Sequence, residues 1–219
     1  SNMGVPALIE AISSHLQDDR LPARTAHIRY TQLPPDHGAM PDVVYLLYSM
    51  GLVPDARALP VWRRVVELLA YVTEADFYEE FNGTFYYVDA VCFAAERLAT
   101  DDLIASLKAL HAHPAFHNRV SAAAFEPDYI LERLAYLELV IGRALARCGS
   151  IDGLVILMSY LRDNRALLAE HAHDELVTIT GVDHGKDTQA WSQWLEANAD
   201  SIRPQPWIQP TDAIQAWSE

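Results

Sequence analysis

The segment Tyr129–Arg147, with the sequence YILERLAYLELVIGRALAR, decides the fold class of this chain. Its apolar residues recur at steps of three and four, which is the spacing of one buried face on an α-helix. This stripe consists of Ile130, Leu134, Leu137, Ile141, Leu145 and Cys148. Because so long an apolar face has to be covered, we expect other helices to pack against it.

Two further helices are predicted after short turns. Gly149-Ser150 ends the first helix, and a second apolar stripe spans residues 151–161. Asp163-Asn164 offers an N-cap for a third helix over residues 165–180, and Gly181 suits the left-handed cap that ends it. Links this short force consecutive helices to lie antiparallel. The second stripe consists of Ile151, Leu154, Val155, Met158 and Leu161.

A similar run of residues occurs earlier in the sequence and indicates an internal repeat. The run Arg97-Leu98-Ala99-Thr100 before Asp102 resembles the run Arg147-Cys148-Gly149-Ser150 before Asp152, about 50 residues later. Residues 5–17, 41–50, 60–75 and 85–99 also show helical spacing, whereas 21–39 and 114–127 are predicted to be irregular. No segment shows a convincing strand pattern. We therefore expect an all-α protein built from repeated helix pairs.

The expected organisation is one helical-repeat domain over residues 3–202. Residues 1–2 read as the remnant of a cleaved purification tag, so the chain is expected to be the C-terminal part of a longer protein. Residues 203–219 are rich in proline and tryptophan, which favours an extended tail packed on the last repeat.

Charge and composition narrow the classes of partner. The 219 residues carry a formal net charge of −14, which disfavours nucleic acid and anionic membrane surfaces because both would be repelled. No apolar run reaches the roughly 20 residues that a membrane-spanning helix needs. Cys92 and Cys148 lie within helical apolar patterns rather than in a disulfide framework, which favours a cytoplasmic protein.

Residues 129–197 resemble the HEAT-like helical repeat families. The matching segments are Leu176-Val177-Thr178-Ile179-Thr180-Gly181 and Asp187-Thr188-Gln189-Ala190-Trp191-Ser192-Gln193-Trp194. The resemblance implies antiparallel helix pairs stacked as a right-handed solenoid, an α-α superhelix. Trp191 and Trp194 are three residues apart on one helix face, so they can cover the edge of the last pair.

A second resemblance involves three other segments. Phe85-Tyr86-Tyr87-Val88-Asp89-Ala90-Val91-Cys92, Glu126-Pro127-Asp128-Tyr129 and Ala169-Glu170-His171-Ala172-His173 are similar to the helical C-terminal region of certain bacterial FAD-dependent oxidoreductases. This resemblance implies that FAD would bind in an upstream domain. The nine glycines of the chain never form G-x-G-x-x-G, so we expect no cofactor site within it.

Histidine clusters raise the question of a metal. His171 and Glu175 are four residues apart on a predicted helix and, with His173, could ligate an ion if a distant residue joined them. His111, His113 and His117 form a second local cluster, in which His113 and His117 have the same spacing, but Pro114 between them breaks the helix. A solvated helix face is the simpler interpretation of both clusters.

An aromatic patch is the other candidate site. Tyr78 follows an acidic stretch, and Phe85, Tyr86 and Tyr87 lie beside Asp89, so they could receive a partner or a small apolar ligand. Helix packing explains the same rings more simply. No nucleophile elbow, zincin helix or P-loop occurs in the sequence.

The sequence therefore predicts a non-catalytic interaction or scaffold domain that binds a protein partner or an upstream domain of the same chain. Two alternatives remain: an accessory domain of a FAD-dependent oxidoreductase, and a metal-binding helical enzyme that uses His171 and His173.

Overall fold

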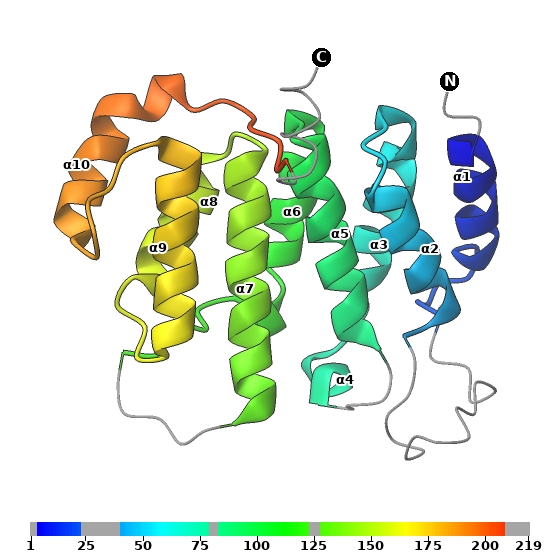
Figure 1. Ribbon diagram of the computed structural model, residues 1–219. Coiled ribbons are helices and arrows are strands. Elements are labelled where there is room, and N and C mark those ends of the chain that lie inside the picture. The colour runs from blue at the N-terminus through cyan, green and yellow to red at the C-terminus, as the bar shows by residue number, and fades with distance from the viewer. Residues whose placement is uncertain (1–3, 23–39, 79–82, 123–127, 209–219) are drawn as a thin grey trace, which may run out of the picture.

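The computed structural model describes residues 4–22, 40–78, 83–122 and 128–208. Within these ranges the regular elements are α-helices and short 3-10 turns, with no strand, so the prediction of an all-α fold is confirmed (Figure 1). None of the described helices is both long and apolar enough to cross a lipid bilayer. The tag remnant and most of the predicted irregular segment 21–39 lie outside the described residues.

Most of the helices follow one another with short connections, and the two long connections lie between α1 and α2 and between α6 and α7. Their bounds are α1 Gly4–His15, α2 Asp42–Gly51, α3 Leu59–Leu69, α4 Glu74–Tyr78, α5 Thr84–Leu98, α6 Ile104–His111, α7 Tyr129–Arg147, α8 Ile151–Tyr160, α9 Ala166–Thr180 and α10 Thr188–Asn198. Short 3-10 turns are η1 Ala56–Ala58, η2 Asp101–Leu103, η3 Pro114–Phe116 and η4 Ala199–Ser201.

The helices are arranged in two rows. Helices α2, α5, α7 and α9 stand side by side in one row, and α3, α6 and α8 lie behind them (Figure 1). Helix α7 is central, because it contacts α5 and α9 within its row and α6 and α8 behind it. The predicted stripe of α7 is buried from Leu134 to Cys148, while Ile130 is half-buried.

Two glycines bring α7 and α8 unusually close together. A Cβ atom at Gly153 would lie 2.1 Å from the Ala146 nitrogen, and one at Gly142 would lie 2.6 Å from Ile156 Cγ2. Because the helices meet along this line, only part of the predicted stripe of α8 faces inward: Leu154 and Leu161 are buried and Met158 is half-buried. Ile151 and Val155, both expected in the core, are 38% and 50% exposed.

The two turns whose sequences resemble each other also have similar backbone conformations. Ala99 after α5 has φ of 42° and Gly149 after α7 has φ of 89°, so each helix ends at a left-handed residue. The next residues, Thr100 and Ser150, are both extended and begin the following element. Ala99 adopts this conformation despite its Cβ, which indicates that the surrounding packing imposes the turn.

Several local details also bear on the predicted boundaries. Gly181 has φ of 73° and caps α9 as expected. The N-cap of α9 is Arg165 rather than Asp163, because the Asp163 carboxylate accepts the Arg165 N–H instead. The helix expected over residues 60–75 ends at Leu69, and a turn that Asp76 stabilises by accepting from Thr73 starts α4.

The C-terminal part of the chain folds back over the rows. Trp191 of α10 is buried and packs edge-to-face with Trp194. The described part of the tail, residues 203–208, then crosses the ends of α7 and α5: the Gln205 N–H donates to the Arg147 carbonyl and the Trp207 N–H to the Glu96 carbonyl (Figure 1). The tail thus lies against earlier helices than the last pair, on which the sequence places it.

Candidate functional site

An aromatic cluster gathers around Arg133 where α5 and α7 begin. The Arg133 guanidinium carbon lies 4.0 Å from the ring centroid of Phe85, 5.4 Å from that of Tyr86 and 5.9 Å from that of Tyr129. Arg133 also donates to the Tyr129 hydroxyl at 3.1 Å. A cation stacked on several rings holds them together, although Tyr86 and Tyr129 keep part of their surface exposed.

Two large apolar side chains are exposed in the first turn of α7, Tyr129 on the side of this cluster and Leu131 on the other side of the helix. Tyr129 is 61% exposed and Leu131 is 41% exposed, although both are large apolar side chains in the first turn of α7. The helix begins there because the Asp128 side chain caps it, accepting the Leu131 N–H at 2.9 Å. We call Tyr86, Tyr129, Leu131 and Arg133 the α7 edge.

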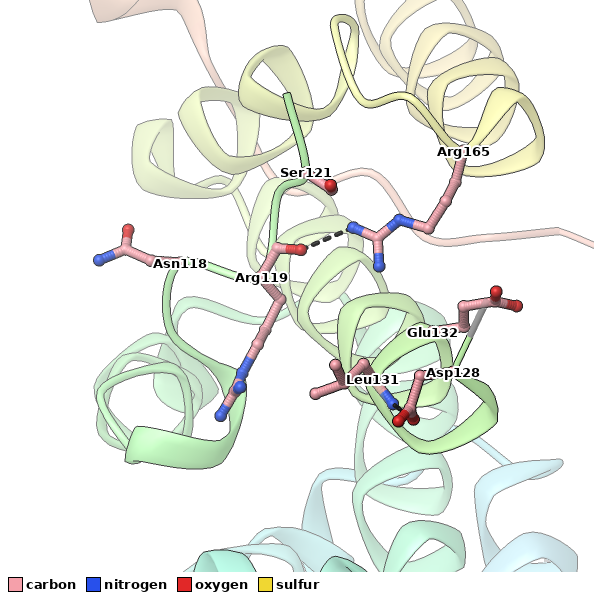
Figure 2. A pocket seen from close by; sticks show the side chains of 7 residues that line it. All are labelled: Asn118, Arg119, Ser121, Asp128, Leu131, Glu132 and Arg165. Carbon is pink, nitrogen blue, oxygen red and sulfur yellow. Dashed lines mark hydrogen bonds between the residues drawn. The ribbon is translucent and has the colours of Figure 1, made fainter. Parts of the chain in front are cut away.

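A small pocket of about 210 Å³ adjoins the α7 edge (Figure 2). It is lined by Asn118, Arg119, Ser121, Asp128, Leu131, Glu132 and Arg165. The Arg165 guanidinium donates to the Arg119 carbonyl at 2.6 Å and also binds Asp163. The Arg119 guanidinium turns away and binds Glu74 at 2.6 Å. Both guanidinium groups near the pocket thus have acidic partners.

The carboxylate of Asp163 binds two of the residues that line this pocket, Ser121 and Arg165. Its side chain is fully buried and accepts the Ser121 N–H, the Arg165 N–H and the Arg165 guanidinium. Burial alone would raise the pKa of Asp163, but these hydrogen bonds outweigh it and lower that pKa. Asp163 is therefore a charged structural anchor between α8 and α9.

Glu138 forms a second buried anchor, in the middle of α7. Its carboxylate accepts the N–H groups of Asn118 and Arg119, at 2.9 and 2.7 Å, and the Tyr160 hydroxyl at 2.6 Å, and it contacts His111 Nε2 at 3.0 Å. Burial opposes ionisation, but the hydrogen bonds from His111, Tyr160 and the Arg119 N–H lower the pKa of Glu138. The sequence analysis did not single out Glu138, although a carboxylate on the apolar face of α7 could have indicated this site.

A chain of ion pairs links α5, α7 and α9. Glu96 of α5 binds Arg143 of α7 at 2.7 Å, and Glu175 of α9 binds Arg147 of α7 at 2.9 Å and lies 3.8 Å from Arg143. Burial raises the pKa of Glu96 to about 7, although Arg143 acts in the opposite direction. The network ties three helices of one row together.

Arg97, next to Glu96, is where the tail is attached. Its guanidinium carbon lies 4.6 Å from the Phe93 ring centroid and 4.8 Å from that of Trp207. Trp207 therefore covers the end of α5 through its ring as well as through its backbone hydrogen bond to Glu96.

The predicted metal ligands His171, His173 and Glu175 all lie on α9, but the structure does not bring them together. Glu175 is bound to arginine side chains of α7. His173 Nε2 lies 2.9 Å from a carboxylate oxygen of Asp183, and His171 is half-buried. The metal assignment to these three residues stays a prediction.

The predicted aromatic patch divides between core and surface. Phe85 is buried and packs on Phe77, and Tyr87 is buried with its hydroxyl donating to the Pro22 carbonyl at 2.6 Å. Tyr86 is half-buried in the Arg133 cluster, and Tyr78 is the last residue of α4, with a side chain outside the described set. The surface role of this patch therefore rests on Tyr86.

Comparison with known proteins gives no family to which the chain can be assigned: no family model, no curated protein and no solved structure matches it. The resemblances to HEAT-like repeats and to flavoenzyme appendages accordingly stay predictions, and the function has to be argued from the geometry.

Proposed function

We propose that this chain is a non-catalytic, HEAT-like helical-repeat domain that binds a protein partner, or an upstream domain of its own polypeptide, at the α7 edge. In this proposal the two rows of helices form a right-handed solenoid. The matching left-handed turns at Ala99 and Gly149 support a repeat of one helix pair over residues 84–111 and another over residues 129–160.

The observation that carries the proposal is the exposure of Tyr129 and Leu131 beside the Arg133 cluster. Tyr129 lies on the Arg133 side of the first turn of α7 and Leu131 on the pocket side. Exposed large apolar side chains near an arginine held among aromatic rings are typical of protein-binding sites. Asp128 and Glu132 border the edge and line the adjoining pocket. With the net charge of −14, these carboxylates favour a partner segment that carries basic and apolar residues.

The buried charged groups support a structural rather than a chemical role. Glu138, Asp163 and Glu96 each bind donors from a neighbouring helix or connection, and each joins elements that are distant in sequence. Such internal pairing fixes the relative position of helices. A binding module needs this rigidity, because a preorganised surface loses less entropy on association.

Site-specific photo-crosslinking tests the proposal. Leu131 is replaced by p-benzoylphenylalanine, and Val155, exposed on the outer face of α8, is replaced in the same way as the matched control. The protein that cross-links at position 131 is identified, purified and titrated by calorimetry. We expect Tyr129→Ser with Leu131→Ser to weaken its binding about tenfold or more, and Ile151→Ser with Val155→Ser to leave it unchanged.

Equal weakening by both double variants, or cross-links that are the same from positions 131 and 155, would contradict the assignment of the α7 edge. Circular dichroism of each variant checks that the helices are retained, so that a loss of binding is not a loss of fold.

A further inference from the structure

Three potential metal ligands converge near the pocket, and none belongs to the trio that the sequence singles out. His111 is the last residue of α6, His117 follows η3, and Glu138 lies in the middle of α7. One ligand atom from each lies within 4.8 Å of the others, the only such group of His, Cys, Asp or Glu found over the described ranges. The two imidazole rings meet edge-to-face with centroids 5.1 Å apart.

The donor set and its spacing match a zinc ion. Zn²⁺ binds imidazole nitrogen and carboxylate oxygen at about 2.0–2.2 Å, which places ligand atoms of a tetrahedral site roughly 3.3 Å apart. His111 Nε2 and Glu138 Oε1 are already 3.0 Å apart. His117 is exposed, so its ring can rotate to complete the set at little cost.

Glu138 is prepared to act as a metal ligand. Its other oxygen accepts the Arg119 N–H and the Tyr160 hydroxyl, which fixes the orientation of the carboxylate. Ligating carboxylates in metal sites are commonly held by such outer hydrogen bonds. The carboxylate is negatively charged, and its negative charge would balance part of the charge of the ion.

We propose that His111, His117 and Glu138 bind one Zn²⁺ ion. Binding uses the His111 tautomer with its proton on Nδ1, so that the Nε2 lone pair faces the ion in place of the present contact with Glu138. The ion joins the end of α6, the segment after η3 and α7. Because His117 is at the surface, the fourth position is open to water.

Calorimetric titration of the tag-free, chelator-treated chain with Zn²⁺ tests the proposal. The wild-type chain should bind one equivalent, and His117→Ala should weaken the affinity at least about tenfold. His117 has no bond to the Glu138 anchor, so this variant should keep its fold. His171→Ala on α9 is the matched control and should bind like the wild type.

A second measurement does not depend on heats of binding. Co²⁺ in place of Zn²⁺ should give the visible absorption bands of a tetrahedral site with nitrogen and oxygen ligands, and His117→Ala should abolish them. Less than about one-tenth of an equivalent of Zn²⁺ bound to the wild type would overturn the proposal. So would equal losses of affinity in His117→Ala and His171→Ala.

Discussion

Two buried glutamates, one in α5 and one in α7, have pKa values that are shifted in opposite directions. Glu96 and Glu138 are each only 4% exposed. Glu138 accepts two backbone N–H groups and a tyrosine hydroxyl and contacts a histidine, and its pKa is lowered. Glu96 is bound by one arginine, and burial raises its pKa to about 7. Equal burial thus leads to opposite shifts, because the number and direction of the donors differ.

This difference separates two kinds of structural tie. The Glu138 anchor is built on backbone donors from the segment after η3, which have no other partner if the carboxylate is lost. The Glu96 network consists of side chains, and Arg143 can still approach Glu175 when Glu96 is neutral. We therefore expect the first to be essential for folding and the second to respond to pH.

The largest effect is expected from Glu138→Ala. Removing the carboxylate leaves the Asn118 and Arg119 N–H groups without their acceptor, although the Tyr160 hydroxyl can still donate to the Ala135 carbonyl. The free energy of unfolding should therefore fall by about 3–5 kcal/mol. Urea unfolding followed by circular dichroism, in buffer containing a chelator, measures this loss. Glu132→Ala, six residues earlier on α7, is the control. A similar small loss of stability in both variants would contradict the assignment of Glu138 as a structural anchor.

A pH dependence should distinguish Glu96 from Glu138. The pKa of Glu96 is about 7 in the fold against an ordinary value of 4.5, so the folded state holds a proton that the unfolded chain releases. The resulting stabilisation is complete below the unfolded pKa and is lost as pH rises toward 7. The free energy of unfolding of the wild type should therefore fall by about 2–3 kcal/mol over this window. Glu96→Gln cannot titrate at this position, so we expect it to lack this decrease.

Urea unfolding of the wild type and of Glu96→Gln at several values from about pH 5 to about pH 8 measures this difference. Other titrating groups are common to both chains and cancel in the comparison. Parallel stability curves for the two proteins would show that Glu96 titrates normally. The stabilisation from Glu138 has the opposite sign, since it is lost as pH falls through its lowered pKa.

Trp207 provides a smaller test, because its ring covers Arg97 and its N–H binds the backbone carbonyl of Glu96. Trp207→Ala removes the ring over Arg97 but keeps the backbone N–H that binds the Glu96 carbonyl. The free energy of unfolding should therefore fall by about 1–2 kcal/mol. Admitting water to the end of α5 should also weaken the pH dependence assigned to Glu96. Ile208→Ala, at an exposed neighbouring position, is the control, and identical unfolding of both variants would argue against this role of the tail.

The smallest effect is expected at an ion pair without burial. Lys108 Nζ lies 2.5 Å from an Asp152 carboxylate oxygen, but both side chains are more than half exposed. Lys108→Ala should therefore change the free energy of unfolding by no more than about 0.5 kcal/mol at low salt. Thermal unfolding at low and high salt tests this, and a loss comparable with that of Glu138→Ala would mean that burial is not what separates strong ties from weak ones.

Much of the fold could be predicted from local patterns. The bounds of α7 follow from an apolar period and from the breaker Gly149, and Gly181 correctly marks the end of α9. The inward face of α8 could be predicted only in part, because the close approach at Gly153 leaves Ile151 and Val155 exposed while Leu154 and Leu161 are buried as expected. Periodicity reports only that a helix is amphipathic, and backbone clearance decides how it is rotated.

The candidate sites were less predictable. His171 and Glu175, four residues apart on α9, were a sensible local pattern, yet Glu175 is held by arginines of α7. The set of His111, His117 and Glu138 spans a connection and two helices, so no fixed spacing reveals it. Likewise Arg133 and Phe85 are almost fifty residues apart in sequence and in contact in space.

The sequence by itself determined the all-helical class that the described residues show, the approximate bounds of α7 and α9, and the similarity of two turns. These properties depend on the period of apolar residues and on the conformational preferences of residues at helix ends, which are local. Only the tertiary structure decided which carboxylates are charged anchors, where the tail lies and which side chains converge. These properties depend on burial and on donors from distant segments, which linear spacing does not encode.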